Sequence, residues 1–157
     1  MVVDETDKFR AIIAGELNEA IDALTVLSRY FGRETLSTAI GELSELLVAE
    51  FSGAERTKRG TRGHDLKTKD GQLIEVKSRF LSHYADTLQF NFRKHTSQAH
   101  IAFCIVWVAN EGERPRLEVV LRVPVPFLLE TWAKPKQPRY CARTTLGALS
   151  RAAQQNS

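Results

Sequence analysis

Asp65, Glu75 and Lys77 are the residues of this chain whose types and spacing most clearly suggest chemistry. Asp65 follows a glycine-containing basic segment, and Asp70-Gly71 is typical of a tight hairpin turn between two short strands. Glu75 and Lys77 alternate with apolar neighbours, which places both charged side chains on one strand face. Asp65, at the far end of the preceding strand, can approach that face. Two carboxylates and an ammonium group in this arrangement suit metal-assisted hydrolysis of a phosphodiester bond.

The two carboxylates are ligands of the kind that Mg²⁺ prefers. Asp65 and Glu75 offer hard oxygen atoms, and the main-chain carbonyl of Val76 can add another, which leaves positions for water and a phosphate oxygen. Lys77 would lie beside the attacking water or the phosphate, where its charge stabilises the transition state. We therefore expect Mg²⁺ as the cofactor, with Mn²⁺ as a substitute, and no organic cofactor.

The order and spacing of these residues form a short motif, in which nine residues separate Asp65 from Glu75-Val76-Lys77. This motif resembles that of the PD-(D/E)xK nuclease superfamily, which includes many type II restriction enzymes, archaeal Holliday junction resolvases and several repair nucleases. His64 stands where the motif name has proline, a position that varies in the superfamily. The resemblance covers about Ile40 to Arg79. It implies that Asp65 and Glu75 bind the metal, that Lys77 is the catalytic lysine, and that the chain is a Mg²⁺-dependent DNA endonuclease of restriction, resolvase or repair type.

A helical acid is the fourth expected member of the site. The segment Gly41-Glu42-Leu43-Ser44-Glu45 is similar to the Gly-Glu-x-x-Glu opening that often supplies an extra acidic metal ligand in this superfamily. The position four residues after Gly41 favours Glu45. A helical wheel instead places Glu42 nearer the edge of the apolar stripe, from which a side chain can reach a sheet. Both residues stay candidates, with Glu45 preferred.

A cluster of cations leads up to Asp65, although the net charge of the whole chain is only +3. Such a cluster either forms a solvated loop or binds the phosphates of a nucleic acid. His64 could touch a phosphate, Ser78 and Arg79 continue the strand that carries Glu75, and Gln89 lies on the polar face of a later strand. The candidate DNA-binding residues are Arg56, Lys58, Arg59, Arg62, His64, Lys67, Ser78, Arg79 and Gln89.

Helices are expected before the motif, and strands around and after it. Apolar residues at helical spacing predict an amphipathic helix over Thr6–Tyr30 and a second over Leu36–Phe51, which ends at Ser52-Gly53. The polar stretch 93–100 is either a short helix or a loop. The predicted strands are His64–Thr68, Gln72–Phe80, Thr87–Phe92, Ile101–Val108 and Leu117–Val123; a turn is expected over Asn110–Pro115, a helical turn over Phe127–Trp132, a loop over Lys134–Pro138 and a helix over Thr144–Gln154.

These elements predict one α/β domain over 1–157, with a restriction-endonuclease-like core and a central mixed sheet flanked by helices. An N-terminal helical extension is expected over about 5–31. The composition is ordinary for a globular domain, with 43% hydrophobic and 26% charged residues. Because the run Ile101–Val108 is apolar on both faces, it predicts a central strand that is covered on both sides.

Two cysteines and the N-terminus indicate the compartment. Cys104 and Cys141 are far apart and are expected to be reduced, and no Cys or His residues show zinc-like spacing. The N-terminus lacks the pattern of a signal peptide, and no segment is long and apolar enough to span a membrane. We therefore expect a cytoplasmic protein with no membrane partner.

Two other functions fit the same residues. The chain could be a nucleic-acid-binding module on a nuclease-like fold that cleaves nothing, in which the basic residues contact phosphates. It could also be an interaction protein whose N-terminal helix pairs with another chain. A homodimer would suit the nuclease as well, because two active sites can cut two strands, with DNA as the expected partner.

Overall fold

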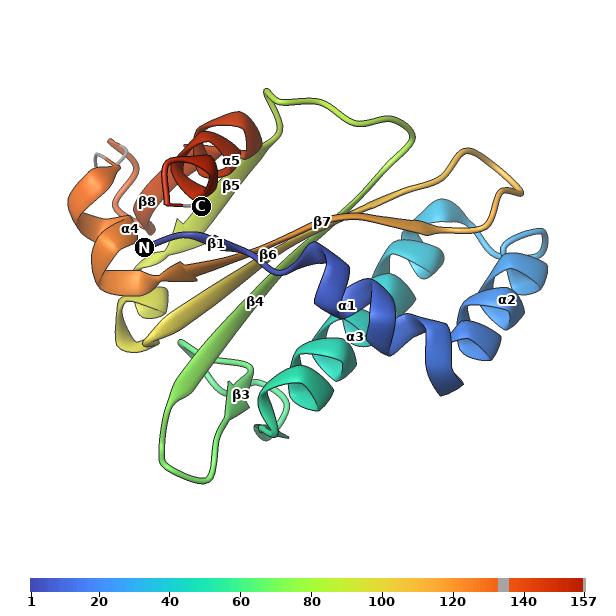
Figure 1. Ribbon diagram of the computed structural model, residues 1–157, viewed down its shortest axis with the longest axis horizontal. Helices are drawn as coiled ribbons and strands as arrows, with labels where there is room; N and C mark the ends of the chain where they lie inside the picture. Colours follow the sequence, from blue (N-terminus) through green and yellow to red (C-terminus); the bar gives the residue numbers. More distant parts are fainter. Residues whose placement is uncertain (133–135, 157) are drawn as a thin grey trace.

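The computed structural model describes residues 1–132 and 136–156 and shows a single α/β domain (Figure 1). Its main sheet has the strand order β1-β7-β6-β4-β3-β2, and β5 pairs with β8 in a separate two-stranded sheet. Strands β4 and β6 are parallel, and the other described pairs are antiparallel, so the predicted mixed sheet is confirmed. The strands are β1 (Val3–Asp4), β2 (Glu55–Arg56), β3 (Leu66–Lys67), β4 (Leu73–Leu81), β5 (Gln89–Arg93), β6 (Ile101–Val108), β7 (Arg116–Pro124) and β8 (Tyr140–Thr145).

Helices lie on both faces of the main sheet. Helices α1 to α3 pack against one face, and the β5–β8 sheet with α4 and α5 packs against the other (Figure 1). The helical segments are α1 (Thr6–Ile12), the π-helical η1 (Ile13–Leu17), α2 (Asn18–Leu27), α3 (Arg33–Ser52), the 3-10 helix η2 (Lys94–Gln98), α4 (Val125–Thr131) and α5 (Leu146–Gln154). Two separate hydrophobic cores result, one on each side of the sheet.

Strand β6 separates the two cores. Phe103, Ile105 and Trp107 belong to the core beneath α1 and α3, whereas Cys104 and Val106 belong to the core beneath β5 and α5. Because successive side chains of a strand point to opposite faces, a strand between two cores has to be apolar throughout. The sequence-based prediction of a central strand covered on both sides is therefore confirmed.

Helix α3 carries the two acids that were proposed to support the site. Its buried residues recur at helical spacing, and Gly53 ends it in the left-handed conformation at φ 65°. A buried hydrogen bond from Trp107 Nε1 to Ser44 Oγ, 3.0 Å long, ties α3 to β6. Ser44 in turn donates to the carbonyl of Ile40. This contact fixes the rotation of the helix and therefore the side on which Glu42 and Glu45 emerge.

The N-terminal helix is shorter and less regular than predicted. The segment Thr6–Tyr30 forms α1, η1 and α2, because Gly15 has the non-helical values φ −84° and ψ −135°. The apolar periodicity continues across Gly15, so it carries no sign of the interruption. Phe9 is fully buried, which makes α1 part of the domain core.

Several predicted strands need correction. The strand expected over Thr87–Phe92 is β5, but it lies outside the central sheet and pairs with β8. The strand expected over His64–Thr68 is limited to β3, so His64 and Asp65 precede it. The segments β1, β2 and β8 were not predicted as strands, and Thr144–Thr145 belong to β8, so the last helix begins at Leu146.

The other predicted secondary-structure elements agree with the structure where it describes the chain. Stretch 93–100, left open as helix or loop, contains η2, and the predicted helical turn over Phe127–Trp132 corresponds to α4. Residues 134–135 of the predicted loop Lys134–Pro138 lie outside the described residues. Among the described helices, none combines the length and the apolar character that crossing a membrane requires.

Candidate active site

Asp65 is held against β4 by both its main chain and its side chain. Its N–H donates to the carbonyl of Ile74 over 2.8 Å, and its Oδ2 accepts from the N–H of Val76 over 2.7 Å. Its own carbonyl accepts from the N–H of Thr57 over 2.9 Å, which closes the base of the loop between β2 and β3. The Asp65 carboxylate is therefore fixed beside the motif strand, as its spacing predicts.

Glu75 and Lys77 lie on one face of β4, and their side chains form an ion pair of 2.5 Å. Their neighbours Ile74 and Val76 contribute to the core under α3, so the pair points to the opposite side of the sheet. Glu75 is 7% exposed. A carboxylate buried to this degree needs a compensating charge, which Lys77 supplies.

The surroundings of Asp65 favour its protonated form. Burial, and next the negative charge of Glu75, raise the pKa of Asp65 from 3.8 to about 6, and Glu45 contributes in the same direction. The hydrogen bond from Val76 and the charge of Lys77 lower it only partly. Burial therefore disfavours the Asp65 carboxylate anion, and a divalent cation bound beside it would favour the ionised form.

The donor atoms suit a small divalent cation. Among the described residues, no three Asp, Glu, His or Cys side chains gather into a metal-binding cluster. Mg²⁺ does not require one, because proteins commonly hold it by one or two carboxylates together with water and substrate phosphates. Asp65 and Glu75 meet this requirement. The Val76 carbonyl faces the same strand edge as its N–H, which points to Asp65.

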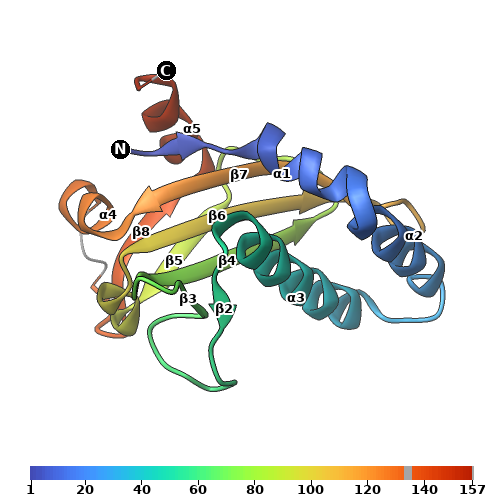
Figure 2. The same ribbon diagram turned by 60° about the horizontal axis from the view of Figure 1, so that its bottom comes forward.

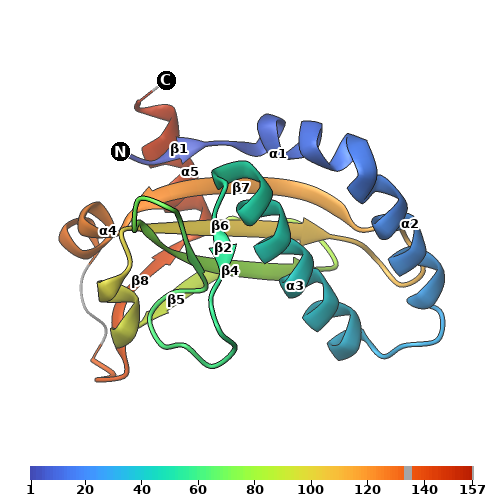
Figure 3. The same cartoon turned by 90° about the horizontal axis from the view of Figure 1, so that it is seen from below.

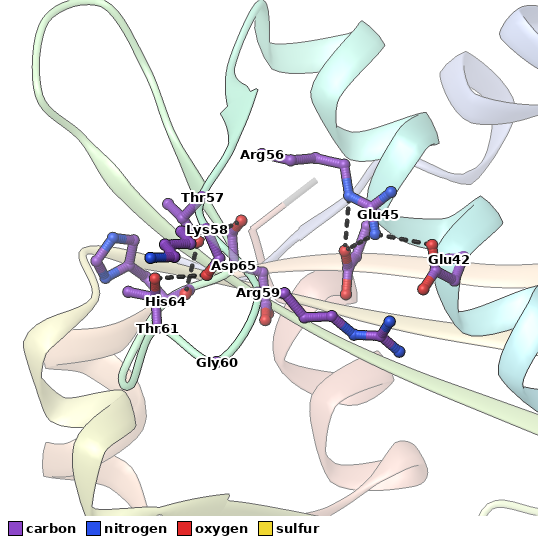
Figure 4. A pocket seen from close by; sticks show the side chains of 10 residues that line it. All are labelled: Glu42, Glu45, Arg56, Thr57, Lys58, Arg59, Gly60, Thr61, His64 and Asp65. Carbon is purple, nitrogen blue, oxygen red and sulfur yellow. Dashed lines mark hydrogen bonds and ion pairs between the residues drawn. The ribbon is translucent and has the colours of Figure 1, made fainter.

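Both helical acids are bound by a single arginine. Arg56 on β2 contacts Glu42 at 3.0 Å and Glu45 at 2.7 Å. Figure 4 draws these contacts as dashed lines. The hydrogen bonds that Arg56 donates to Glu42 and to Glu45 raise the pKa of its guanidinium. The Glu45 side chain is 29% exposed, against 52% for Glu42, and Glu45 is the one that acts on the pKa of Asp65. Arg56, predicted as a DNA-binding residue, is thus also the counter-charge of these acids.

Two pockets meet at Asp65. The first, about 540 Å³, lies between α3 and the β2–β3 loop, and the second, about 300 Å³, lies between the same loop and η2. Figures 2 and 3 show the loop that joins β2 to β3, with α3 on one side of it and η2 on the other. Thr61 and Asp65 line both pockets. The first is lined by Glu42, Glu45, Arg56, Thr57, Lys58, Arg59, Gly60, Thr61, His64 and Asp65, and the second by Thr61, Arg62, Gly63, Asp65, Glu75, Lys77, Arg93, His95 and Thr96.

The predicted DNA-binding residues divide between these pockets and other places. Arg56, Lys58, Arg59 and His64 line the first pocket, and Arg62 lines the second. Nδ1 of His64 is buried without a hydrogen-bond partner in the described part of the chain. The other candidates lie away from both linings: Lys67 is exposed on β3, Ser78 faces Gly41 of α3, and Arg79 contacts the carbonyl of the exposed Gln89 over 3.5 Å.

Sequence analysis indicated one wall of the second pocket only in part, from the polar face of the strand that ends at Arg93. Arg93, His95 and Thr96 come from β5 and η2, which the chain reaches only after leaving β4. They carry no motif spacing relative to Glu75, because their proximity depends on how the chain crosses from β4 to β6. The sequence pattern that points to this wall is a strand with alternating apolar residues, followed directly by a run of polar and basic residues.

Comparison of the sequence with protein-family models and with curated proteins found no match. The site is therefore interpreted from its own residues and geometry.

Gly63 joins the loop to η2, and its replacement provides a test of that contact. At φ +90°, a Cβ on Gly63 would lie 2.7 Å from the main-chain oxygen of His95. We expect Gly63→Ala to lower the free energy of unfolding more than Gly60→Ala, by about 1 kcal/mol or more, because a Cβ there overpacks the contact. Gly60 is the matched control, with φ +88° and open space around it. Chemical denaturation measures both variants, and equal losses would contradict a close contact at Gly63.

Proposed function

We propose that this protein is a Mg²⁺-dependent DNA endonuclease that hydrolyses phosphodiester bonds. The observation that carries the proposal is the convergence of Asp65, Glu75 and Lys77, with Asp65 Oδ2 hydrogen-bonded to the motif strand and Lys77 paired with Glu75. The resemblance of these residues to the PD-(D/E)xK motif supports the same reaction. A restriction-endonuclease-like core is part of the proposal.

Each residue has a defined role in the proposed reaction. Asp65, Glu75 and the Val76 carbonyl would hold Mg²⁺, which supplies Lewis-acid activation of the phosphodiester when it is bound. The hydrogen bond from Val76 orients Asp65 before substrate arrives. Lys77 Nζ, held beside the site by Glu75, donates hydrogen bonds toward the attacking water and the phosphate and stabilises the charge that develops there. Glu45 is the preferred supporting acid, because it acts electrostatically on Asp65.

The charges around the first pocket support a nucleic-acid substrate. Lys58 and Arg59 are exposed and line it, and neither has an ion-pair partner in the described part of the chain. Cations without carboxylate partners beside a candidate metal site would neutralise the phosphates of a bound strand. DNA binding is therefore expected to weaken steeply as salt concentration rises.

Cleavage of plasmid and branched DNA tests the proposal. Purified protein with Mg²⁺ or Mn²⁺ should convert supercoiled plasmid or a branched oligonucleotide to shorter or relaxed products, and EDTA should stop the reaction. Glu75→Ala should lose both cleavage and ion binding measured by calorimetry. Failure of the wild-type protein to cleave any of several DNA structures with either metal would refute a nuclease function.

A DNA-binding module that does not cleave is the second candidate. It is favoured by the pairing of Glu42 and Glu45 with Arg56 and of Glu75 with Lys77, since each acid could serve only to position a cation. In that case, DNA binding survives Asp65→Ala and Glu75→Ala, and no metal supports cleavage. The plasmid experiment, repeated with a binding assay on the same variants, separates the two candidates.

We also propose that the protein is a homodimer, with a contact at the end of α2. Val26, Leu27, Tyr30 and Phe31 are all large apolar residues that remain exposed, and Tyr30 is 80% exposed. We expect the wild-type protein to sediment as a dimer and the Tyr30→Ser, Phe31→Ser variant to sediment as a monomer with an unchanged circular dichroism spectrum. Tyr84→Ser, at an exposed aromatic residue elsewhere, is the control. A monomeric wild type at all concentrations would exclude this interface.

A further inference from the structure

We propose that the second pocket, between the β2–β3 loop and η2, binds a phosphate of the substrate strand next to the scissile one. The strand would then extend on both sides of Asp65, with one side in each pocket. The inference rests on the proposed function, because it concerns the substrate of that same site. It assigns Arg62, already a candidate DNA-binding residue, to this neighbouring phosphate and adds Arg93, which belongs to no motif in the sequence.

The charges of the second pocket carry the first step. Lys77 is paired with Glu75, so its charge is already compensated within the protein. Arg62 and Arg93 line the same pocket, both are exposed, and neither guanidinium has a hydrogen-bond or ion-pair partner within residues 1–132 and 136–156. Other arginines, such as Arg56 and Arg122, are bound to carboxylates. Two uncompensated guanidinium groups around one pocket suit a phosphate, which arginine binds through two parallel hydrogen bonds.

The backbone on both walls of the pocket is fixed, which is the second step. Gly63 approaches the carbonyl of His95 so closely that it has no room for a side chain, so the loop is seated on η2. On the other wall, Arg93 pairs with Tyr140 of β8 at a register shift that follows Phe92. Such bulges redirect a side chain from the regular alternation of a strand. The main-chain carbonyl of Arg93 also accepts a hydrogen bond from Cys141 Sγ over 3.2 Å. Arg62 and Arg93 therefore start from positions that need little ordering when a ligand binds.

The position of Asp65 links this pocket to the first one. Asp65 and Thr61 line both pockets, and unpaired cations lie on each side, Lys58 and Arg59 in the first and Arg62 and Arg93 in the second. A strand whose scissile phosphate lies at Asp65 can thus place a neighbouring phosphate in either direction. A site that binds phosphates on both sides of the cut accepts an internal position of a strand, as an endonuclease must.

Salt-dependent DNA binding tests the phosphate site without requiring cleavage. Binding of a fluorescent duplex oligonucleotide is measured in EDTA over a range of salt concentrations for the wild type, Arg62→Ala, Arg93→Ala, Arg93→Lys and Arg29→Ala. Each phosphate contact that is lost should reduce the slope of log K against log salt by about 0.9. We expect this loss for Arg62→Ala and Arg93→Ala, and a wild-type slope for Arg93→Lys. Arg29→Ala should also keep the wild-type slope, because Arg29 is an exposed arginine that lines neither pocket. Thermal melts of all variants verify that they fold.

The outcomes separate this inference from the proposed function. Wild-type slopes in both alanine variants overturn the phosphate site, even if the protein cleaves DNA. Reduced slopes together with no cleavage by the wild type support the phosphate site and refute the nuclease. If the wild type binds neither duplex nor branched DNA, both fail. If the protein cleaves DNA, a single neutral methylphosphonate linkage should raise the KM when it is placed on either side of the cut. Arg93→Ala should remove this effect on one side only. An effect on only one side in the wild type would overturn the two-sided path.

Discussion

Replacing Lys77 with methionine is expected to reduce the rate of Mg²⁺-dependent DNA cleavage by roughly 10²–10⁴-fold, the range typical of a positioned acid–base group. Methionine keeps much of the apolar stem of lysine and removes the ammonium group, so packing along β4 changes little. Single-turnover rates with saturating protein measure the chemical step and avoid effects on DNA affinity. A rate within twofold of the wild type would mean that Lys77 takes no part in the reaction.

The same variant should change how Mg²⁺ affects stability. Glu75 is 7% exposed and its Lys77 partner lies at 2.5 Å, so Lys77→Met leaves a buried carboxylate without its counter-charge. We expect a lower melting temperature in EDTA and a larger increase on addition of Mg²⁺ than in the wild type, because an ion that binds the folded state replaces the missing charge. Lys67→Met is the matched control, since Lys67 is an exposed lysine that lines neither pocket. Equal Mg²⁺ effects in all three proteins would contradict ion binding beside Glu75.

Replacing Asp65 with asparagine is expected to eliminate measurable cleavage and to stabilise the fold at alkaline pH. The amide oxygen of asparagine can still accept the hydrogen bond that Val76 donates. The charge that burial and Glu75 disfavour is removed. The pKa of Asp65 is about 6 in the folded protein, against 3.8 ordinarily, so the folded state holds this proton more tightly than the unfolded chain. Ionisation of Asp65 therefore lowers the free energy of unfolding of the wild type. This loss is absent below about pH 4, grows between about pH 4 and 6, and is complete above about pH 6.

Urea denaturation at several pH values measures this effect. Asp65→Asn should unfold with a free energy about 1–2 kcal/mol higher than the wild type at pH 8, after allowance for solvent screening, and the difference should vanish near pH 4. Asp70→Asn is the control with the opposite sign. A hydrogen bond from Thr68 lowers the pKa of the exposed Asp70, so its replacement should give no stabilisation at pH 8. A variant Asp65→Asn that is less stable than the wild type at pH 8 would contradict the raised pKa.

The parts of the fold that local pattern determines could be predicted from the sequence. Helix α3 and strands β4, β6 and β7 have strong periodicity or continuous apolar runs, and each was found within a few residues of its observed bounds. Strand β5 also has clear alternation, but alternation does not specify which strand it pairs with, and its partner β8 was not identified. The break at Gly15 was missed because a glycine is compatible with a helix unless packing requires otherwise.

The residues of the candidate site also fall into those that local sequence pattern predicts and those that depend on packing. Asp65, Glu75 and Lys77 were identified because they lie within one hairpin, where the spacing of residues nearly fixes the spacing of side chains. The pairing of Arg56 with Glu42 and Glu45 depends on how α3 packs beside β2, so the sequence suggested a DNA contact and a metal ligand but not their mutual ion pairs. Arg93 and His95 reach the site because of the path of the chain between β4 and β6, and the sequence indicated only that the strand ending at Arg93 has a polar face.

The parallel pairing of β4 with β6 has a consequence for the order in which the molecule assembles. Glu75 is in register with Ala102, and Lys77 with Cys104, so each contact closes a loop that includes β5 and η2. Parallel strands cannot be joined by a tight turn, and the entropy of closing such a loop makes these contacts slow to form. We expect the β3–β4 hairpin to form early, and the strand that carries Glu75 and Lys77 to become rigid only when β6 has docked. The proposed catalytic residues therefore acquire their final positions late in folding, and a nascent chain that ends before Val108 would bring the three residues together without a framework to hold them.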